Sequence, residues 1–268
     1  MPSLGLGLGL QRPVGSLLDS DIRAFANESG ATDLAGLKNL VAYLKGENLY
    51  SNFVIYPMKS AQNAGSGSVV YSLGGLTTNN MTLVSLPTWS ATGITFDGVA
   101  DYGHIEDFLN GGSLTTFNRA TITSINSTSR AIWGIFNPNA NNQSVLISSI
   151  NDSGNLLQLI RSSDGSSTNR EVYRGSIGAL SEQLYVNSWT NGGGRNSWQD
   201  KSSMSLSLVV GSAQTSRYNA SSRITVGAVE DNTTPQNFWS GQFNSSAVYN
   251  GILTTTQRES VTDLINAL

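Results

Sequence analysis

The sequence predicts a mostly β protein, an antiparallel β-sandwich with a short N-terminal arm, a small helical leader and a C-terminal helix. From residue 81 onward, short apolar runs recur at intervals of about ten residues, separated by clusters of Asn, Gly, Ser and Pro. Runs such as 203–208 alternate polar and apolar residues, which turns one face of a strand inward and the other outward. Aromatic residues make up 8% of the 268 residues, and aliphatic residues occur along most of the length, so a core can be buried.

Residues 1–15 have the pattern of an extended assembly arm, in which Leu4, Leu6, Leu8 and Leu10 alternate with glycine. Glycine at every second position makes an isolated strand costly in conformational entropy. Either this segment lies on a neighbouring subunit, or it is an edge strand of the same chain. It has no basic region and no long apolar stretch, so we expect neither a Sec-type signal peptide nor insertion into a membrane.

Residues 16–60 are predicted to form a leader with two short amphipathic helices, because apolar residues recur at helical spacing between capping and stop residues. Residues 61–80 are rich in small residues and turn formers, which predicts a linker. Residues 81–268 then form the sandwich. The expected helix boundaries are Asp19 or Ser20 and Gly30 for the first helix, and Thr32 or Asp33 and Gly46 for the second.

Within the sandwich, turn signals such as those at 151–154 and 163–165 separate consecutive strands and favour antiparallel hairpins. Residues 52–58 form one more apolar strand or turn before the linker. The C-terminal helix is expected to begin at a Thr254 or Thr255 cap. The predicted strands are 81–86, 93–96, 119–125, 131–136, 145–150, 156–161, 171–173, 183–187, 203–210, 223–229 and 241–249.

Composition excludes several classes of function. The formal net charge is −3 and there is no run of Lys or Arg, so the chain lacks the positive surface that binds a phosphate backbone, and we expect no nucleic-acid partner. The absence of cysteine excludes disulfides, thiolate metal sites and cysteine nucleophiles. His104 is the single histidine, which excludes chemistry that needs several, and we expect it to be a surface residue or one with its hydrogen bonds satisfied.

Residues 93–102, which read Gly-Ile-Thr-Phe-Asp-Gly-Val-Ala-Asp-Tyr, resemble the opening strand of concanavalin A-like, laminin G-like jelly rolls. Residues 223–228, 238–243 and 247–250, followed by Leu-Thr and the final helix, are similar to the closing part of the same family. The two helices in front, followed by 53–58, resemble the leader of bacteriophage tail and minor structural proteins that carry such domains.

This resemblance implies a two-sheet jelly roll used for carbohydrate contact or for particle architecture. We therefore expect a structural protein of a bacteriophage virion, made in the host cytoplasm, which decorates the capsid or tail through its N-terminal region. The expected partners are other virion proteins and further copies of the chain, since trimers are common among such appendages. Two alternatives are a lectin-like adhesin that binds host surface polysaccharide, and a polysaccharide depolymerase.

Catalysis is not expected. The resemblance implies that enzymes of this fold carry a Glu-x-Asp-x-x-Glu run on one strand, so that alternation points all three carboxylates into one cleft. No two glutamates in this chain have that spacing. The sequence therefore predicts a non-enzymatic protein without catalytic residues.

The most suggestive recognition segment is 185–198, in which two tryptophans flank a polar stretch that we expect to be a flexible loop. Sugar sites combine an aromatic platform with amides and hydroxyls. Protein interfaces also favour Trp, Tyr and Arg, and either tryptophan could instead pack in the core. The candidate contacts with glycan or partner are Trp189, Asn191, Arg195, Trp198 and Trp239.

No cofactor is expected, with one metal site left open. Asp97 and Asp101 could offer carboxylate oxygens to Ca²⁺, which binds several such ligands. The alternative is that Asp97 and the glycine after it form the tight turn that ends the strand.

Overall fold

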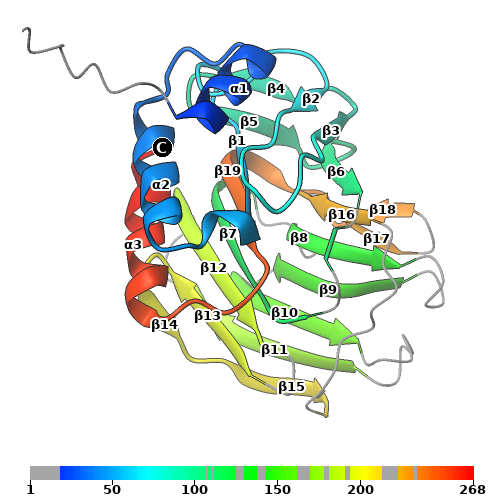
Figure 1. The fold of residues 1–268 in the computed structure, drawn as a ribbon. Helices are drawn as coiled ribbons and strands as arrows, with labels where there is room; N and C mark the ends of the chain where they lie inside the picture. Colours follow the sequence, from blue (N-terminus) through cyan, green and yellow to red (C-terminus); the bar gives the residue numbers. More distant parts are fainter. Residues whose placement is uncertain are drawn as a thin grey trace, which may run out of the picture.

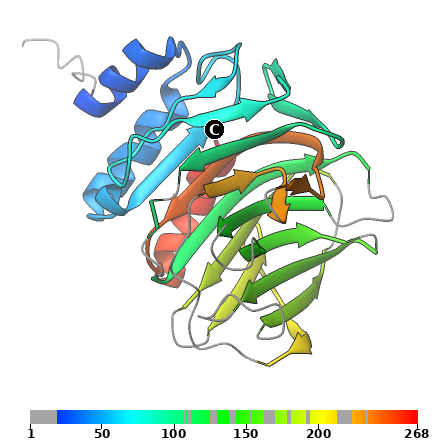
Figure 2. The same ribbon diagram turned by 90° about the vertical axis from the view of Figure 1, so that its right-hand side faces the viewer.

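The computed structural model describes residues 19–106, 108–109, 112–124, 130–137, 143–151, 153–161, 170–177, 181–190, 194–212, 223–231 and 234–268. In this part of the chain the molecule has three layers, with helices packed on an eight-stranded sheet that is in turn packed on a nine-stranded sheet (Figures 1 and 2). The predicted mostly β sandwich with a C-terminal helix is confirmed. None of the described helices is long and apolar enough to cross a membrane.

Sheet A has the strand order β14-β13-β12-β7-β19-β5-β4, and every described pair is antiparallel. β1 and β5 both pair with the same edge of β19, β5 with its first half and β1 with its second half. The predicted strand at 52–58 is therefore part of this sheet. The strands are β1 (Phe53–Pro57), β4 (Thr88–Ser90), β5 (Gly93–Asp97), β7 (Leu114–Ile122), β12 (Gln183–Trp189), β13 (Arg195–Gln199), β14 (Ser202–Met204) and β19 (Ser240–Tyr249).

Sheet B has the order β15-β11-β10-β9-β8-β16-β6-β3-β2, and its described pairs are also antiparallel. A separate hairpin of β17 (Val229–Asp231) and β18 (Thr234–Gln236) follows β16. The strands of sheet B are β2 (Val69–Val70), β3 (Met81–Val84), β6 (Tyr102–Glu106), β8 (Arg130–Asn137), β9 (Gln143–Ile150), β10 (Asn155–Arg161), β11 (Arg170–Ser176), β15 (Ser207–Gly211) and β16 (Arg223–Val226).

Two predicted strands are broken in the structure. The run 203–210 divides into β14 of sheet A and β15 of sheet B, so the chain changes sheets where an unbroken strand was predicted. The run 223–229 is interrupted at Gly227, which has a φ of +80°. A Cβ there would lie 2.4 Å from the ring of Phe96, so a close approach between the two sheets requires glycine at this bend.

The helices begin and end largely where capping chemistry places them. Asp19 caps α1 (Ser20–Ser29) by accepting a hydrogen bond from the Asp21 N–H at 2.9 Å, and Gly30 ends it in the left-handed conformation. Thr254 caps α3 (Thr255–Asn266) in a reciprocal capping box. Both predictions are confirmed.

The second helix begins later than predicted. α2 (Ala35–Gly46) ends at the expected glycine, but Thr32 and Asp33 lie outside it. Their backbone N–H groups donate to the carbonyl of Ala61, at 2.9 and 2.8 Å, which ties this segment to the following loop. The predicted start is therefore wrong by one or two residues, since Leu34 occupies the N-cap position.

Two hydrophobic clusters hold the layers together. One lies between the sheets, and the other lies between sheet A and the helices. Sheet A is thus covered on both faces, which explains why six of the seven residues of β12 are buried in succession rather than alternately. The largest fully buried side chains include Trp133, Trp239 and Phe243 between the sheets, and Phe53 and Phe117 under the helices.

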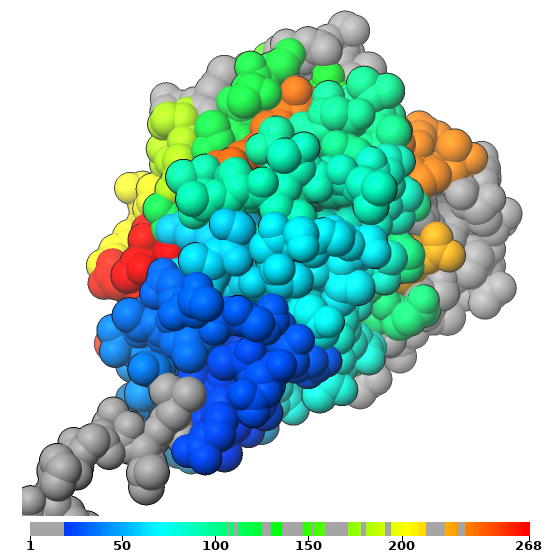
Figure 3. Space-filling view, turned by 90° about the horizontal axis from the view of Figure 1, so that it is seen from above, coloured from blue at the N-terminus to red at the C-terminus, as the bar shows by residue number. Residues whose placement is uncertain are grey.

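The segment predicted as a linker contributes to both the sheets and the core. β2 lies within it and joins sheet B, Val70 is fully buried, and Leu73 bridges to Ile55 of β1. In the space-filling view the leader helices and the strands that follow them form one continuous surface (Figure 3). The predicted assembly arm at 1–15 lies outside the described residues.

Candidate functional site

The segment predicted as a flexible recognition loop contains a strand. Residues Arg195–Gln199 form β13 and pair with β12, so that Trp189 lies opposite Arg195, and Val186 lies opposite Trp198. Side chains alternate along each strand. Trp189 and Arg195 therefore face the space between the sheets, while Trp198 lies on the opposite face of sheet A, under the helices. The predicted candidates are thus divided between two sites.

The inward-facing pair is buried. The Arg195 Nε–H donates to Glu171 Oε1 across the sheets, and the two side chains are only 2% and 1% exposed. The guanidinium carbon also lies 4.9 Å from the centre of the Trp189 ring, a cation–π distance. Burial lowers the pKa of Arg195 from its usual value, and the carboxylate of Glu171 partly opposes that shift. This pair joins β11 of sheet B to β13 of sheet A and offers no surface to a ligand.

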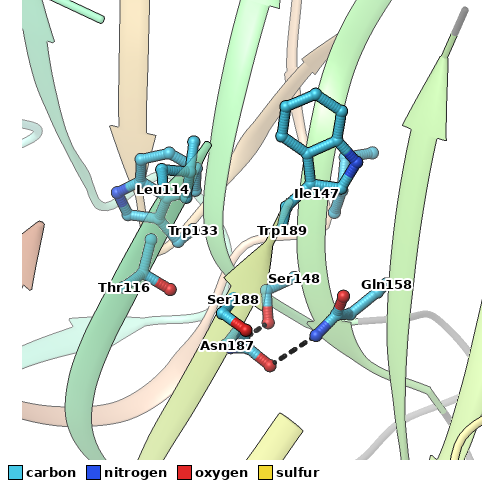
Figure 4. Close-up of a pocket in the computed structure, with 9 residues that line it drawn as sticks. All are labelled: Leu114, Thr116, Trp133, Ile147, Ser148, Gln158, Asn187, Ser188 and Trp189. Atoms are coloured by element: carbon cyan, nitrogen blue, oxygen red, sulfur yellow. Dashed lines mark hydrogen bonds between the residues drawn. The ribbon is translucent and has the colours of Figure 1, made fainter. Parts of the chain in front are cut away.

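Next to it lies a buried polar network (Figure 4). Gln158 Nε2 donates to Asn187 Oδ1 at 2.9 Å, and Asn187 Nδ2 donates to Ser148 Oγ at 3.1 Å. The cavity they border is about 20 Å³, which is room for roughly one water molecule. Trp133 and Trp189 line its other side. This cavity between the sheets is therefore too small to hold a sugar.

A larger hollow lies on the helix-covered side of sheet A and is lined by residues of β12, β13 and the beginning of α3. Figure 1 shows the position of these three elements. We call it the Trp198 hollow. Its volume is about 210 Å³. The lining residues come from four parts of the chain and are Thr115, Ser188, Asn196, Trp198, Ile252, Leu253, Thr255 and Arg258.

Two of the lining residues, Trp198 and Arg258, are in contact with each other. The guanidinium carbon of Arg258 lies 4.1 Å from the centre of the half-buried Trp198 ring, so the two planar groups are in cation–π contact. Arg258 Nη2 donates to Glu259 Oε1 at 3.0 Å. Among the described residues, Nη1 has no hydrogen-bond partner. The arginine is held in place by two neighbours and retains a donor for a ligand.

Three further side chains bring unused hydrogen-bonding groups to the hollow. The hydroxyls of Ser188 and Thr255 and the amide of Asn196 make no hydrogen bond to any described residue. Thr115 Oγ1 donates to the carbonyl of Gly251 at 3.0 Å and can still accept. Beside these groups Ile252 is 43% exposed. The hollow therefore offers both apolar surface and several neutral donors and acceptors.

The aspartates predicted as calcium ligands bind the backbone of their own turn. Asp97 Oδ1 accepts from the N–H groups of Val99, Ala100 and Asp101, at 2.8, 2.9 and 3.1 Å. Asp101 Oδ2 accepts in return from the Asp97 N–H. In the described part of the chain, no group of three or more His, Asp or Glu side chains could hold a metal ion. The structure thus favours the turn over the metal site.

The electrostatics of the two aspartates agree with that arrangement. Burial raises the pKa of the Asp97 carboxyl, but the N–H donors of Ala100 and Val99 outweigh it and leave the pKa below its usual value. Burial also raises the pKa of Asp101, and the nearby Asp97 charge adds to that shift.

The remaining predicted contacts are core residues or lie outside the described chain. Trp239 is fully buried between the sheets, and its Nε1–H donates to the carbonyl of Thr121 at 3.2 Å. Asn191 and the arm leucines Leu4, Leu6, Leu8 and Leu10 lie outside the described residues. Of the four predicted contacts that lie within the described residues, Trp198 is the one that lines the hollow.

No protein-family model matches the sequence, and no curated protein is a match. Similar solved structures include a mutant of Trypanosoma rangeli sialidase displaying trans-sialidase activity, with a TM-score of 0.58 and 14% identity over 85% of this chain and 39% of that one. Another is Trypanosoma rangeli sialidase in complex with sialic acid, with a TM-score of 0.57 and 13% identity over 87% and 39%. The chain thus covers 39% of the length of these sialidases, and at such identities the similarity shows the fold alone.

These similarities correct the prediction of a non-enzymatic protein. Solved structures that share the fold include the sialidases described above, which are glycoside hydrolases. The absence of a Glu-x-Asp-x-x-Glu run tests one arrangement of catalytic groups, and a sandwich can bring carboxylates together from different strands. The prediction is therefore wrong in excluding an enzyme on the ground of a missing motif.

Proposed function

We propose that this chain binds carbohydrate and that the Trp198 hollow holds one sugar ring. The observation that carries the proposal is the convergence of Ser188, Asn196, Thr255 and Arg258, all with unused hydrogen-bonding capacity, on a hollow with exposed apolar surface. A sugar ring has the matching character, since its hydroxyls donate and accept in many directions while its C–H groups pack on apolar surface.

The size of the hollow supports a single ring. Pockets for drug-sized ligands measure roughly 300–1,000 Å³. The Trp198 hollow, at about 210 Å³, is smaller and suits one ring of a longer glycan whose other units extend into solvent. The edge of Trp198 and the side chain of Ile252 would contact the C–H face of that ring.

The fold agrees with this proposal without selecting a ligand. It occurs within sialidases, one of which was solved in complex with sialic acid. The chain covers 39% of that protein, so the sugar bound there is not carried over to the Trp198 hollow.

A glycan array probed with the whole chain, followed by calorimetry on the best ligand, tests the proposal. Trp198→Ala should reduce affinity by about tenfold or more, because the ligand loses its contact with the edge of the aromatic ring and Arg258 loses its cation–π partner. Trp89→Ala is the matched control, since Trp89 is also half-buried but lies on β4 at the opposite edge of sheet A. Absence of binding to any glycan, or equal affinity in both variants, would refute the proposal. Free sugar released from the bound glycan is measured in the same samples, and its appearance would show that the chain also hydrolyses the glycan.

The setting that we propose for this binding is the bacteriophage virion, as the sequence resemblance implies. A glycan-binding domain on a tail or capsid would contact host surface polysaccharide. The support for this setting is the resemblance of the leader, the two helices followed by residues 53–58, to that of bacteriophage tail and minor structural proteins. Antibody labelling of intact particles in the electron microscope should place the protein on their surface, and particles that lack it would contradict this setting.

A further inference from the structure

The charge of the hollow is balanced by a residue just outside it. Arg258 is the one charged side chain among the described residues that line the hollow. Its Nη2 donates to Glu259 Oε1 at 3.0 Å, and the two side chains are 10% and 42% exposed. The positive charge available to a ligand is thus already paired with a carboxylate.

This pairing affects charged and neutral ligands differently. Nη1 and Nη2 belong to one small planar group, so a ligand carboxylate that accepted from Nη1 would lie close to the carboxylate of Glu259. The attraction of the ligand to Arg258 would be opposed by repulsion of similar size from Glu259. A hydroxyl that accepts from the same donor meets no such repulsion.

The beginning of α3 is a second source of positive potential beside the hollow. The N-terminus of α3, at Thr255, carries a partial positive charge that favours anions. This effect falls off within the first turn and is weakened at an exposed position such as Thr255. The capping box of Thr254 and Gln257 also satisfies two of the exposed N–H groups there. The helix end therefore offsets Glu259 only in part.

We infer that the Trp198 hollow selects uncharged sugar rings over carboxylate-bearing ones, and that Glu259 is the positioning residue that sets this selectivity through Arg258. The inference rests on the proposed function, because it names the class of ligand for the same hollow. The other polar groups of the hollow agree with it, since the hydroxyls of Ser188 and Thr255 and the amide of Asn196 are all neutral.

The experiment compares sugars that differ at one position. The probes are the methyl glycosides of glucose and galactose and the matching methyl glucuronide and galacturonide, in which a carboxylate replaces the terminal CH₂OH. Their affinities are measured by calorimetry for the unaltered chain, for Glu259→Gln, and for Asp263→Asn. Asp263 is the matched control, because it is on the same helix and its loss changes the net charge equally, while its own partner is Lys201.

The unaltered chain should bind the preferred neutral glycoside more tightly than its uronide, because the carboxylate of the uronide loses hydration in the hollow and gains no net attraction in return. Glu259→Gln should remove or reverse that preference, whereas Asp263→Asn should preserve it. A loss of packing alone would weaken both glycosides together and leave their ratio unchanged. Two results would overturn the inference but leave carbohydrate binding intact. One is equal or tighter binding of the uronide by the unaltered chain, and the other is a ratio of neutral-glycoside to uronide affinity that Glu259→Gln does not change. Failure of all four sugars and of the glycan array would overturn the proposed function itself.

Discussion

The ion pair of Glu171 and Arg195 gives the sharpest test of the sandwich. Its side chains are 1% and 2% exposed and it spans the two sheets, so solvent screens it very little. Arg195→Ala leaves the charge of Glu171 buried without its partner, which costs about 3–5 kcal/mol in comparable proteins. The lost contact with the Trp189 ring, at 4.9 Å, is part of the same substitution. We therefore expect the free energy of unfolding to fall by about 4 kcal/mol.

Equilibrium unfolding in urea, followed by tryptophan fluorescence, measures this loss. Lys201→Ala is the matched control, because its partner Asp263 and Lys201 itself are 62% and 46% exposed, and exposed pairs contribute about 0–1 kcal/mol. Replacing both partners, with Glu171→Leu and Arg195→Met together, should recover most of the loss because no unpaired charge remains. The reasoning is refuted if Arg195→Ala costs no more than Lys201→Ala.

Three further predictions concern stability. Gly241→Ala should destabilise the sandwich strongly or prevent folding, because the new Cβ would lie 2.0 Å from the carbonyl oxygen of Thr121. The midpoint of thermal unfolding measures this effect, and an unchanged midpoint would contradict the prediction. Asp97 has a folded-state pKa below its unfolded value of about 3.9, so its stabilising effect is present above that pH and is lost as the pH falls through the lower folded value. Asp97→Ala should therefore lower stability at pH 7 and flatten the acid limb of the pH–stability curve, and an unaltered acid limb would rule out this role. Chelation with EDTA should leave the midpoint of thermal unfolding unchanged, since Asp97 and Asp101 bind backbone N–H groups. A lower midpoint after chelation would instead support a bound calcium ion.

Much of the architecture could be predicted because its signals are local. Helix ends follow from capping side chains such as Asp19 and Thr254, whose chemistry acts within three residues. Strands with alternating or continuous apolar runs and turns between them were predictable for the same reason. The short strand β13 was not, because glycine and asparagine around it favour a loop, and its pairing with β12 stabilises the strand.

The site could be predicted only in part. The sequence indicates that Trp189 and Trp198 belong to one segment, but only the register of β12 and β13 decides that one is buried between the sheets and the other faces the helices. Arg258, Ser188 and Ile252 carry no motif, and they come together because α3 packs beside these strands. A site assembled from distant segments leaves no pattern in the chain that would identify it.

A crystal structure of the chain with its preferred methyl glycoside tests the central claim most directly. We expect one sugar ring in the Trp198 hollow, in contact with the Trp198 ring and hydrogen-bonded to Arg258 Nη1. A ring bound between the sheets near Trp189, or on the opposite face of sheet B, would contradict it.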